Sequence, residues 1–237
     1  MSRLTQAVVL LLFGGAILRA SITDLYLRYV KEGLRPFLLA AGLLLVAAAV
    51  TTLWQSLRAG EAEEDHGHSH SHEPRIGWLL ILPVLGLLLV APPALGSFAA
   101  GKSGSVSATP VSDSDYPALP AGDPVPVSLL DYASRALFDE GKSLTGRNVK
   151  LTGFVTPAPD GSPMLARIVL SCCAADGRPI KLGLTGQVPL EVPADTWIEV
   201  TGAYSTQRGK DPVNEVDVAY LEVKTWQEID QPKQPYA

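Results

Sequence analysis

Cysteine and histidine are scarce in this chain of 237 residues. The two cysteines, Cys172 and Cys173, are adjacent, and the four histidines all lie between His66 and His72. Neighbouring cysteines cannot join distant parts of a fold, so a disulfide framework is excluded. The C-terminal half has no histidine and therefore no Ser/His/Asp or Cys/His arrangement for nucleophilic catalysis. We expect that the protein is not an enzyme.

Charged residues are also few. They make up 18% of the chain, and the net charge is -5. Nucleic-acid binding requires a basic surface, so no nucleic-acid partner is expected. Hydrophobic residues make up 47% and are concentrated before about residue 95. This distribution indicates a membrane half followed by a soluble half.

Three long apolar runs occupy residues 4–18, 37–53 and 76–95. Each approaches the length that a helix needs to cross a hydrocarbon core of about 30 Å. A charged hinge and a second run directly follow the first one, which favours an uncleaved span over a cleaved signal peptide. The sequence predicts a three-span, multi-pass module over residues 1–95, embedded in the lipid bilayer of the cell membrane.

The orientation of these spans has two opposing indications. The hinge holds four basic residues against three on the other side, and this difference favours a cytoplasmic hinge. The basic residues counted are Arg19, Arg28, Lys31 and Arg35 in the hinge, and Arg3, Arg58 and Arg75 opposite. The linker at 96–126, rich in Pro, Ser and Gly, is instead typical of a spacer before an exported domain. We expect an extracytoplasmic C-terminal domain, with the reverse topology as the alternative.

A His-rich loop lies between the second and third runs, at residues 58–75. Asp65 precedes His66, His68, His70 and His72, which alternate with Gly and Ser. Imidazole ligates Zn²⁺ and other transition metals, and small residues between ligands let a flexible chain wrap an ion. This pattern predicts that the loop captures Zn²⁺ or a similar ion reversibly. No tightly bound cofactor is expected. Two alternatives are a solvated loop that binds ions incidentally and a pH sensor.

The soluble half reads as one short helix followed by five strands. Ser128 can cap an amphipathic helix that ends before Gly141. Strand-like runs follow at 149–155, 165–172, 179–184, 197–204 and 216–226.

Glycines within two of these runs, Gly153 and Gly202, favour sharply bent strands. The predicted fold class is therefore α+β: a three-span transmembrane helical bundle, then a small OB-like barrel over 127–230 with one short helix, and a tail at 231–237. A β-sandwich is the alternative.

A second candidate metal site consists of Cys172, Cys173 and Asp176, where the second predicted strand ends. Successive strand side chains point to opposite faces, so one cysteine is expected to face the barrel interior and the other the surface. A surface thiol there can act as a soft-metal or redox ligand, with Asp176 nearby as an oxygen donor. The simpler alternative is a buried cysteine acting as a small apolar residue, with Asp176 forming a turn.

Several segments in order resemble the YcgQ-like bacterial membrane proteins, which are described as subunits of a two-component permease. The segments are residues 29–36, the His-rich loop, and residues 151–154, 172–176, 197–202 and 226–236. The resemblance covers nearly the whole chain and implies a separate multi-spanning permease subunit as partner. The loop here lacks the cysteines of some relatives, and the pair at 172–173 replaces a single cysteine.

Two functions follow from these observations. The first is an accessory subunit of a membrane permease that captures or buffers a transition-metal ion on the His-rich loop. The second is a membrane-anchored module that binds a protein or another ligand, in which the His tract is incidental. The three apolar runs contain no charged residue, so the chain by itself offers an ion no polar route across a bilayer.

Overall fold

The computed structural model describes residues 3–59, 86, 92–106 and 116–237. The chain divides into two compact units, Met1–Pro93 and Ala94–Ala237. Asp65, the four histidines and most of the third expected span lie outside the described residues. The metal-capture loop and the third span therefore stay predictions.

The first unit contains two long apolar helices, α1 (Arg3–Ile22) and α2 (Arg35–Ala59). Two short 3₁₀ turns, η1 (Leu25–Arg28) and η2 (Glu32–Leu34), join them. The stretches Leu4–Ile22 and Glu32–Arg58 are long and apolar enough to cross a membrane. Many of their large apolar side chains are exposed, which suits a lipid environment better than water.

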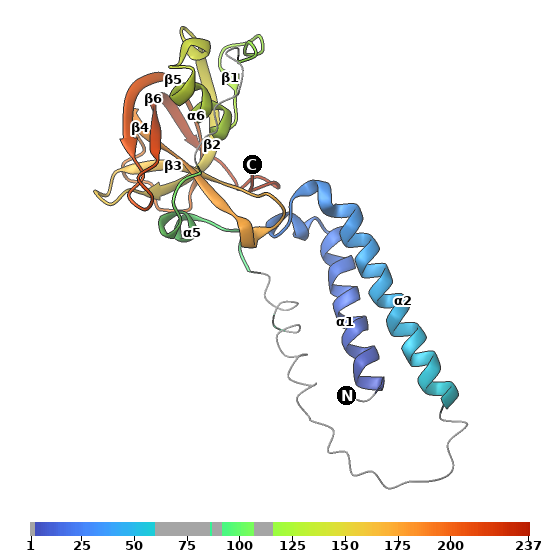
Figure 1. Cartoon of the computed structure of the whole chain (residues 1–237). Coiled ribbons are helices and arrows are strands. Elements are labelled where there is room, and N and C mark those ends of the chain that lie inside the picture. Colours follow the sequence, from blue (N-terminus) through green and yellow to red (C-terminus); the bar gives the residue numbers. More distant parts are fainter. Residues whose placement is uncertain (1–2, 60–85, 87–91, 107–115) are drawn as a thin grey trace. The chain divides into compact units, whose positions relative to one another are not determined.

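Small residues form the contact between α1 and α2, which lie side by side (Figure 1). A β-carbon on Gly14 would lie 2.9 Å from Val46 Cγ2 and 3.0 Å from the Gly42 carbonyl oxygen. Small side chains allow this close approach, as is common between membrane helices. The buried small residues recur every seventh position, at Ala7, Gly14 and Ser21 in α1 and at Gly42 and Ala49 in α2.

Replacing Gly14 with leucine is expected to destabilise this helix pair by about 1–3 kcal/mol, because the added side chain has no room. Gly15 is the matched control, since a β-carbon there meets nothing within 4 Å. Both substitutions raise helix propensity equally. Thermal unfolding of the purified protein in detergent measures the difference, and equal unfolding temperatures for the two variants would contradict the packing.

The second unit contains a closed barrel of five strands. They are β2 (Asn148–Pro157), β3 (Pro163–Val169), β4 (Arg178–Gly186), β5 (Trp197–Lys210) and β6 (Asp217–Glu228). Neighbouring strands follow the order β2-β3-β4-β6-β5, and pairing of β2 with β5 closes the ring. The β4–β6 pair is parallel and the other four are antiparallel. The predicted barrel is confirmed, and the β-sandwich alternative is wrong.

The short strand β1 (Val125–Pro126) pairs in parallel with β2, and α6 (Leu129–Phe138) follows it. The Asp131 amide donates to the Ser128 hydroxyl at 3.0 Å, so the predicted helix cap is confirmed. The buried face of α6 joins the barrel core, and the Tyr132 hydroxyl donates to the Tyr220 carbonyl at 2.6 Å. A further 3₁₀ turn, η3 (Lys142–Leu144), leads into β2.

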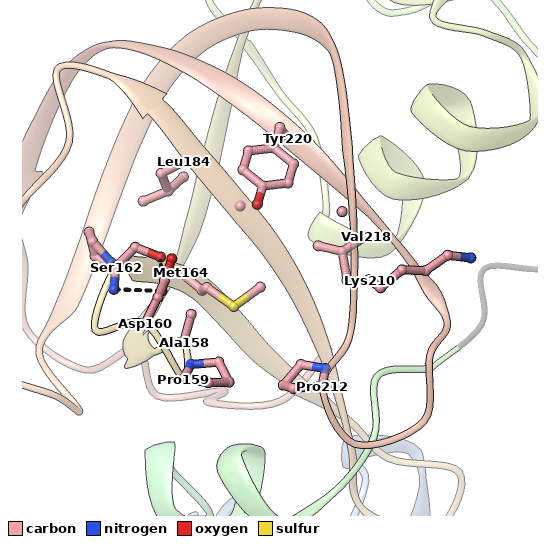
Figure 2. A pocket seen from close by; sticks show the side chains of 13 residues that line it. Ala158, Pro159, Asp160, Ser162, Met164, Leu184, Lys210, Pro212, Val218 and Tyr220 are labelled. Carbon is pink, nitrogen blue, oxygen red and sulfur yellow. Dashed lines mark hydrogen bonds between the residues drawn. The ribbon is translucent and has the colours of Figure 1, made fainter.

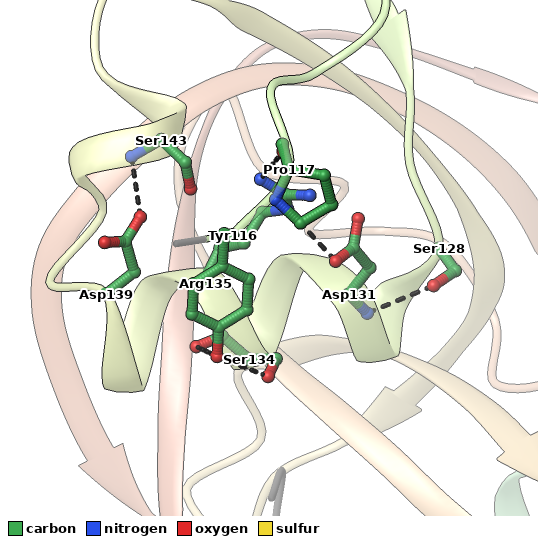
Figure 3. Close-up of polar contacts among 8 residues, drawn as sticks. All are labelled: Tyr116, Pro117, Ser128, Asp131, Ser134, Arg135, Asp139 and Ser143. Atoms are coloured by element: carbon green, nitrogen blue, oxygen red, sulfur yellow. Dashed lines mark hydrogen bonds and ion pairs between the residues drawn. The ribbon is translucent and has the colours of Figure 1, made fainter. Parts of the chain in front are cut away.

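Polar contacts from α6 hold Tyr116 and Pro117, which precede the barrel in the chain (Figure 3). The buried Arg135 guanidinium ion-pairs with Asp131 at 3.0 Å and donates to the Pro117 carbonyl at 3.0 Å. It also lies 5.3 Å from the centre of the Tyr116 ring, and the Tyr116 hydroxyl hydrogen-bonds Ser134. All of these groups are satisfied within the fold, so the cluster has a structural role.

A second, smaller apolar cluster lies outside the main core. The helix α5 (Ser97–Lys102) contributes Ala100 to it, and the C-terminal tail contributes Tyr236. The Tyr236 hydroxyl accepts a hydrogen bond from the Leu95 amide at 2.9 Å. The strand residues buried in this cluster are Phe154, Ala166, Ile168 and Trp197, with Leu170 just beyond β3. Residues 94–106 and the tail therefore pack as part of the barrel unit.

Candidate functional site

Cys172, Cys173 and Asp176 converge at one point on the barrel unit. One ligand atom from each residue, two Sγ atoms and a carboxylate oxygen, all lie within 4.8 Å of one another. Cys172 is exposed, and the other two residues are half-buried. Among the residues that the structure describes, this is the one group of three or more metal-ligating side chains in such proximity.

The local fold differs from the sequence expectation. Strand β3 ends at Val169, and Cys173 already caps the 3₁₀ turn η4 (Ala174–Asp176). Neither cysteine belongs to a strand, so the alternation of strand side chains does not apply to them. The prediction that one thiol faces the barrel interior is wrong, because the chain turns before it reaches them.

The Asp176 carboxylate holds the turn in shape. It accepts hydrogen bonds from the backbone amides of Ser171 at 3.0 Å, Cys172 at 2.8 Å and Cys173 at 3.4 Å. A carboxylate that collects several amide donors fixes the direction of the intervening backbone. Asp176 therefore positions the two thiols on the same side of the turn, whether or not it ligates an ion itself.

The Cys172 thiol and the Asp176 carboxylate shift each other's pKa. A hydrogen bond with Asp176 raises the pKa of Cys172 to about 11, and the neighbouring Cys173 thiol adds to this rise. The same contact with Cys172, followed by the backbone amides, lowers the pKa of Asp176 to about 2. An ion that binds the Cys172 sulfur must displace its proton, so affinity is expected to fall as the pH falls.

The cluster of Cys172, Cys173 and Asp176 offers an ion only three ligands among the described residues. Structural metal sites are closed by four protein ligands, whereas three ligands at a surface leave a coordination position free. Thiolates favour soft and borderline ions such as Cu(I) and Zn²⁺. The cluster therefore suits an ion that is taken up and passed on more than one that is held permanently.

Sequence reasoning missed a second feature, a pocket of about 240 Å³ at one end of the barrel (Figure 2). The turn between β2 and β3 and the connection between β5 and β6 form its walls, with Tyr220 of β6 inside. The sequence signal is a pair of strand glycines. A β-carbon on Gly183 would clash with the Tyr220 ring, and one on Gly209 would lie 3.0 Å from it.

These observations define a class of protein: two apolar helices with the dimensions of membrane spans, followed by a closed five-stranded barrel that carries a partly exposed Cys-Cys-Asp cluster, Cys172, Cys173 and Asp176. Two family models match the chain, the DUF1980 N-terminal domain over residues 5–105 and the DUF1980 C-terminal domain over residues 133–237. Together they cover most of its length, so the chain belongs to the DUF1980 family. No curated protein and no solved structure matches it. The YcgQ-like resemblance and the permease link stay predictions.

Proposed function

We propose that the protein is a membrane-anchored accessory subunit that captures a transition-metal ion for a multi-spanning permease. The observation that carries the proposal is the convergence of the Cys172 and Cys173 sulfurs with the Asp176 carboxylate. Two thiolates on one side of a turn bind an ion together with little loss of conformational entropy, because the turn is already fixed. The protein performs no catalysis in this proposal.

The His-rich loop supplies a second and weaker set of ligands. His66, His68, His70 and His72, with Asp65, bind Zn²⁺ or a similar ion, and the Cys-Cys-Asp cluster is a separate and more selective site. Neutral imidazole is the ligating form, so capture by the loop weakens as the pH drops through about 6.5.

A partner permease is needed because the apolar runs offer no path for an ion. No charged residue occurs within residues 4–18 or 36–57, nor in the third run at 76–95. Charged or polar groups mark ion pathways inside membranes. We propose that the third run also spans the bilayer and that the barrel is extracytoplasmic. The Cys-Cys-Asp cluster then binds its ion outside the cell, and the His-rich loop, which precedes the third run, buffers ions on the cytoplasmic side.

The barrel itself is proposed to be of the OB type. Its closed strand order, with one parallel and four antiparallel pairings, is what a five-stranded Greek-key barrel requires. Gly202 lies at a shift in the β5–β6 register, where the strand bends.

The test is metal titration of the full-length protein, purified in detergent without metal. Co²⁺ is the probe, because its thiolate complexes absorb in the near ultraviolet and its imidazole complexes do not. We expect thiolate absorption from the wild-type protein and its complete loss in a Cys172→Ser/Cys173→Ser variant. Replacing all four histidines with alanine should lower the number of bound ions and leave the thiolate absorption intact.

Ser171→Ala is the matched control, since it changes the neighbouring exposed side chain and keeps the backbone amide that Asp176 binds. Persistence of the thiolate band in the double cysteine variant, or its absence from the wild-type protein, would overturn the proposal. With the permease present, the histidine variant should transport less metal only when metal is limiting, because a capture site is redundant at saturation.

A second candidate function is a membrane-anchored binding module, and the pocket at the end of the barrel favours it. In that case the barrel recognises a ligand and the His tract is incidental. Two results would favour this function. At limiting metal, the histidine variant would transport metal as well as the wild-type protein does, and the pocket would be found to bind a ligand.

A further inference from the structure

The pocket at the end of the barrel combines polar and apolar groups in a particular arrangement. Pro159, Pro212, Leu184 and Val218 provide apolar surface, and Asp160 lies in the β2–β3 turn at its edge. Figure 2 shows the Tyr220 hydroxyl pointing into this space. At about 240 Å³ the pocket is smaller than the usual sites for drug-sized ligands. It fits a single side chain or a small molecule.

The charge at the pocket is negative. Ser162 donates its amide at 3.0 Å and its hydroxyl at 2.6 Å to one oxygen of Asp160, Oδ1. Among the described residues, Asp160 has no cationic partner. These hydrogen bonds with Ser162 also lower the pKa of Asp160, so the carboxylate is ionised at neutral pH. The turn thus presents a fixed anion.

The cation in the lining is already neutralised. The Lys210 ammonium lies 2.7 Å from the Asp217 carboxylate and points away from the pocket in Figure 2. It therefore does not compensate Asp160. An anionic ligand would meet Asp160 with no free positive charge to balance it, whereas a cationic ligand would meet an unpaired carboxylate.

The Tyr220 side chain adds a second polar group. Its ring is half-buried and is held in place by Gly183 and Gly209, whose backbones leave no room for side chains. Within the described part of the chain, its hydroxyl has no hydrogen-bond partner. A phenol oxygen is a good acceptor for an ammonium proton, and the Met164 thioether beside it is a weak acceptor.

We propose that this pocket binds an alkylammonium group, with the charge at Asp160 and the Tyr220 hydroxyl and the aliphatic stem along Pro159 and Pro212. The group belongs either to a small primary amine or to a lysine side chain of a polypeptide. This assignment is independent of the metal proposal, because the pocket and the Cys-Cys-Asp cluster share no residue.

The experiment uses methionine as a reporter. The chain has two methionines, Met1 and Met164, and Met164 lines the pocket. Full-length protein labelled with ¹³C in the methionine methyl groups is titrated in detergent with n-butylammonium. The neutral 1-butanol and the anion pentanoate, which carry the same butyl chain, are the matched probes. We expect a saturable shift of the Met164 resonance with n-butylammonium alone, while the Met1 resonance stays unchanged.

Variants test the assigned contacts. Asp160→Asn retains an acceptor for Ser162 and should weaken n-butylammonium binding about two- to fivefold, because the charge interaction that is lost is exposed and partly screened by solvent. Tyr220→Phe should weaken it several-fold. Asp230→Asn, which removes an exposed carboxylate outside the pocket, is the matched control and should leave the affinity unchanged.

Two further results distinguish the sources of the amine. Tighter binding of a short lysine-containing peptide than of n-butylammonium indicates a polypeptide partner, and the reverse indicates a small amine; both support the proposal. Equal affinity for 1-butanol, preference for pentanoate, or an unchanged affinity in Asp160→Asn would overturn it. Because no metal is present in this titration, its failure leaves the metal proposal unaffected.

Discussion

Replacing Asp211 with alanine is expected to lower the free energy of unfolding of the barrel unit by about 3–5 kcal/mol. The Asp211 side chain is fully buried and that of Lys181 is 4% exposed, and their charged atoms lie 2.9 Å apart. Removing the carboxylate leaves a buried ammonium whose remaining partner is the Ser103 carbonyl at 2.9 Å. An uncompensated buried charge is far more costly than a lost surface contact.

The pair also organises the surrounding backbone. The Asp211 carboxylate accepts hydrogen bonds from the amides of Ser105 at 3.0 Å and Val213 at 2.9 Å. Asn214 donates to the Ser105 carbonyl at 2.9 Å. The alanine variant therefore also leaves amides unsatisfied, and adding Lys181→Met should restore only part of the lost stability.

Asp217→Ala is the control for this prediction. Its ion pair with Lys210 is shorter, at 2.7 Å, but the two side chains are 53% and 58% exposed. Solvent screens such a pair, so its loss should cost far less than the loss of the buried pair. Chemical denaturation in detergent, followed by tryptophan fluorescence, to which the buried Trp197 contributes, measures both variants. Equal losses would show that burial does not govern the strength of the Lys181–Asp211 pair.

The second large effect concerns which residues the barrel needs in order to fold. A fragment of residues 94–237 is expected to be soluble and folded, whereas residues 127–230 alone should aggregate or unfold. The shorter fragment lacks Ala100, Ser105 and Tyr236. Without these residues, the second, smaller apolar cluster (the outer cluster) is exposed. The buried Lys181–Asp211 pair also loses hydrogen-bonding partners.

Circular dichroism and size-exclusion chromatography of the two fragments test this expectation. A fragment of residues 94–230 is an informative intermediate, because it keeps α5 and omits the tail with Tyr236. Its stability should lie between the other two. Equal stability of the 127–230 and 94–237 fragments would show that the outer cluster is dispensable.

Much of the architecture was accessible from local patterns. The apolar runs at 4–18 and 37–53 predicted α1 and α2, because a stretch of uninterrupted apolar residues has few alternatives to a membrane helix. Ser128 predicted the start of α6, since capping depends on neighbouring residues alone. The five strand runs matched β2 to β6, and the glycines favoured the bends that a closed barrel needs.

The candidate sites were only partly accessible. The composition of residues 172–176 indicated a metal site, but the strand alternation assumed for Cys172 and Cys173 was wrong, since the chain turns after Val169. Nothing in the sequence joined Asp160 to Tyr220, which lie 60 positions apart. Closure of the barrel brings the β2–β3 turn beside β6, and that contact depends on long-range strand pairing.

The sequence by itself determined the apolar helices, the helix cap, the strand runs and the types of ligand available, because these depend on residues close together in the chain. Only the tertiary structure decided that residues 94–106 and the tail cover the barrel, that the β2–β3 turn lies beside Tyr220, and that Lys181 meets Asp211. Each of these contacts joins side chains whose positions are set by packing and by the desolvation of charge. Those terms arise only when distant segments are brought together.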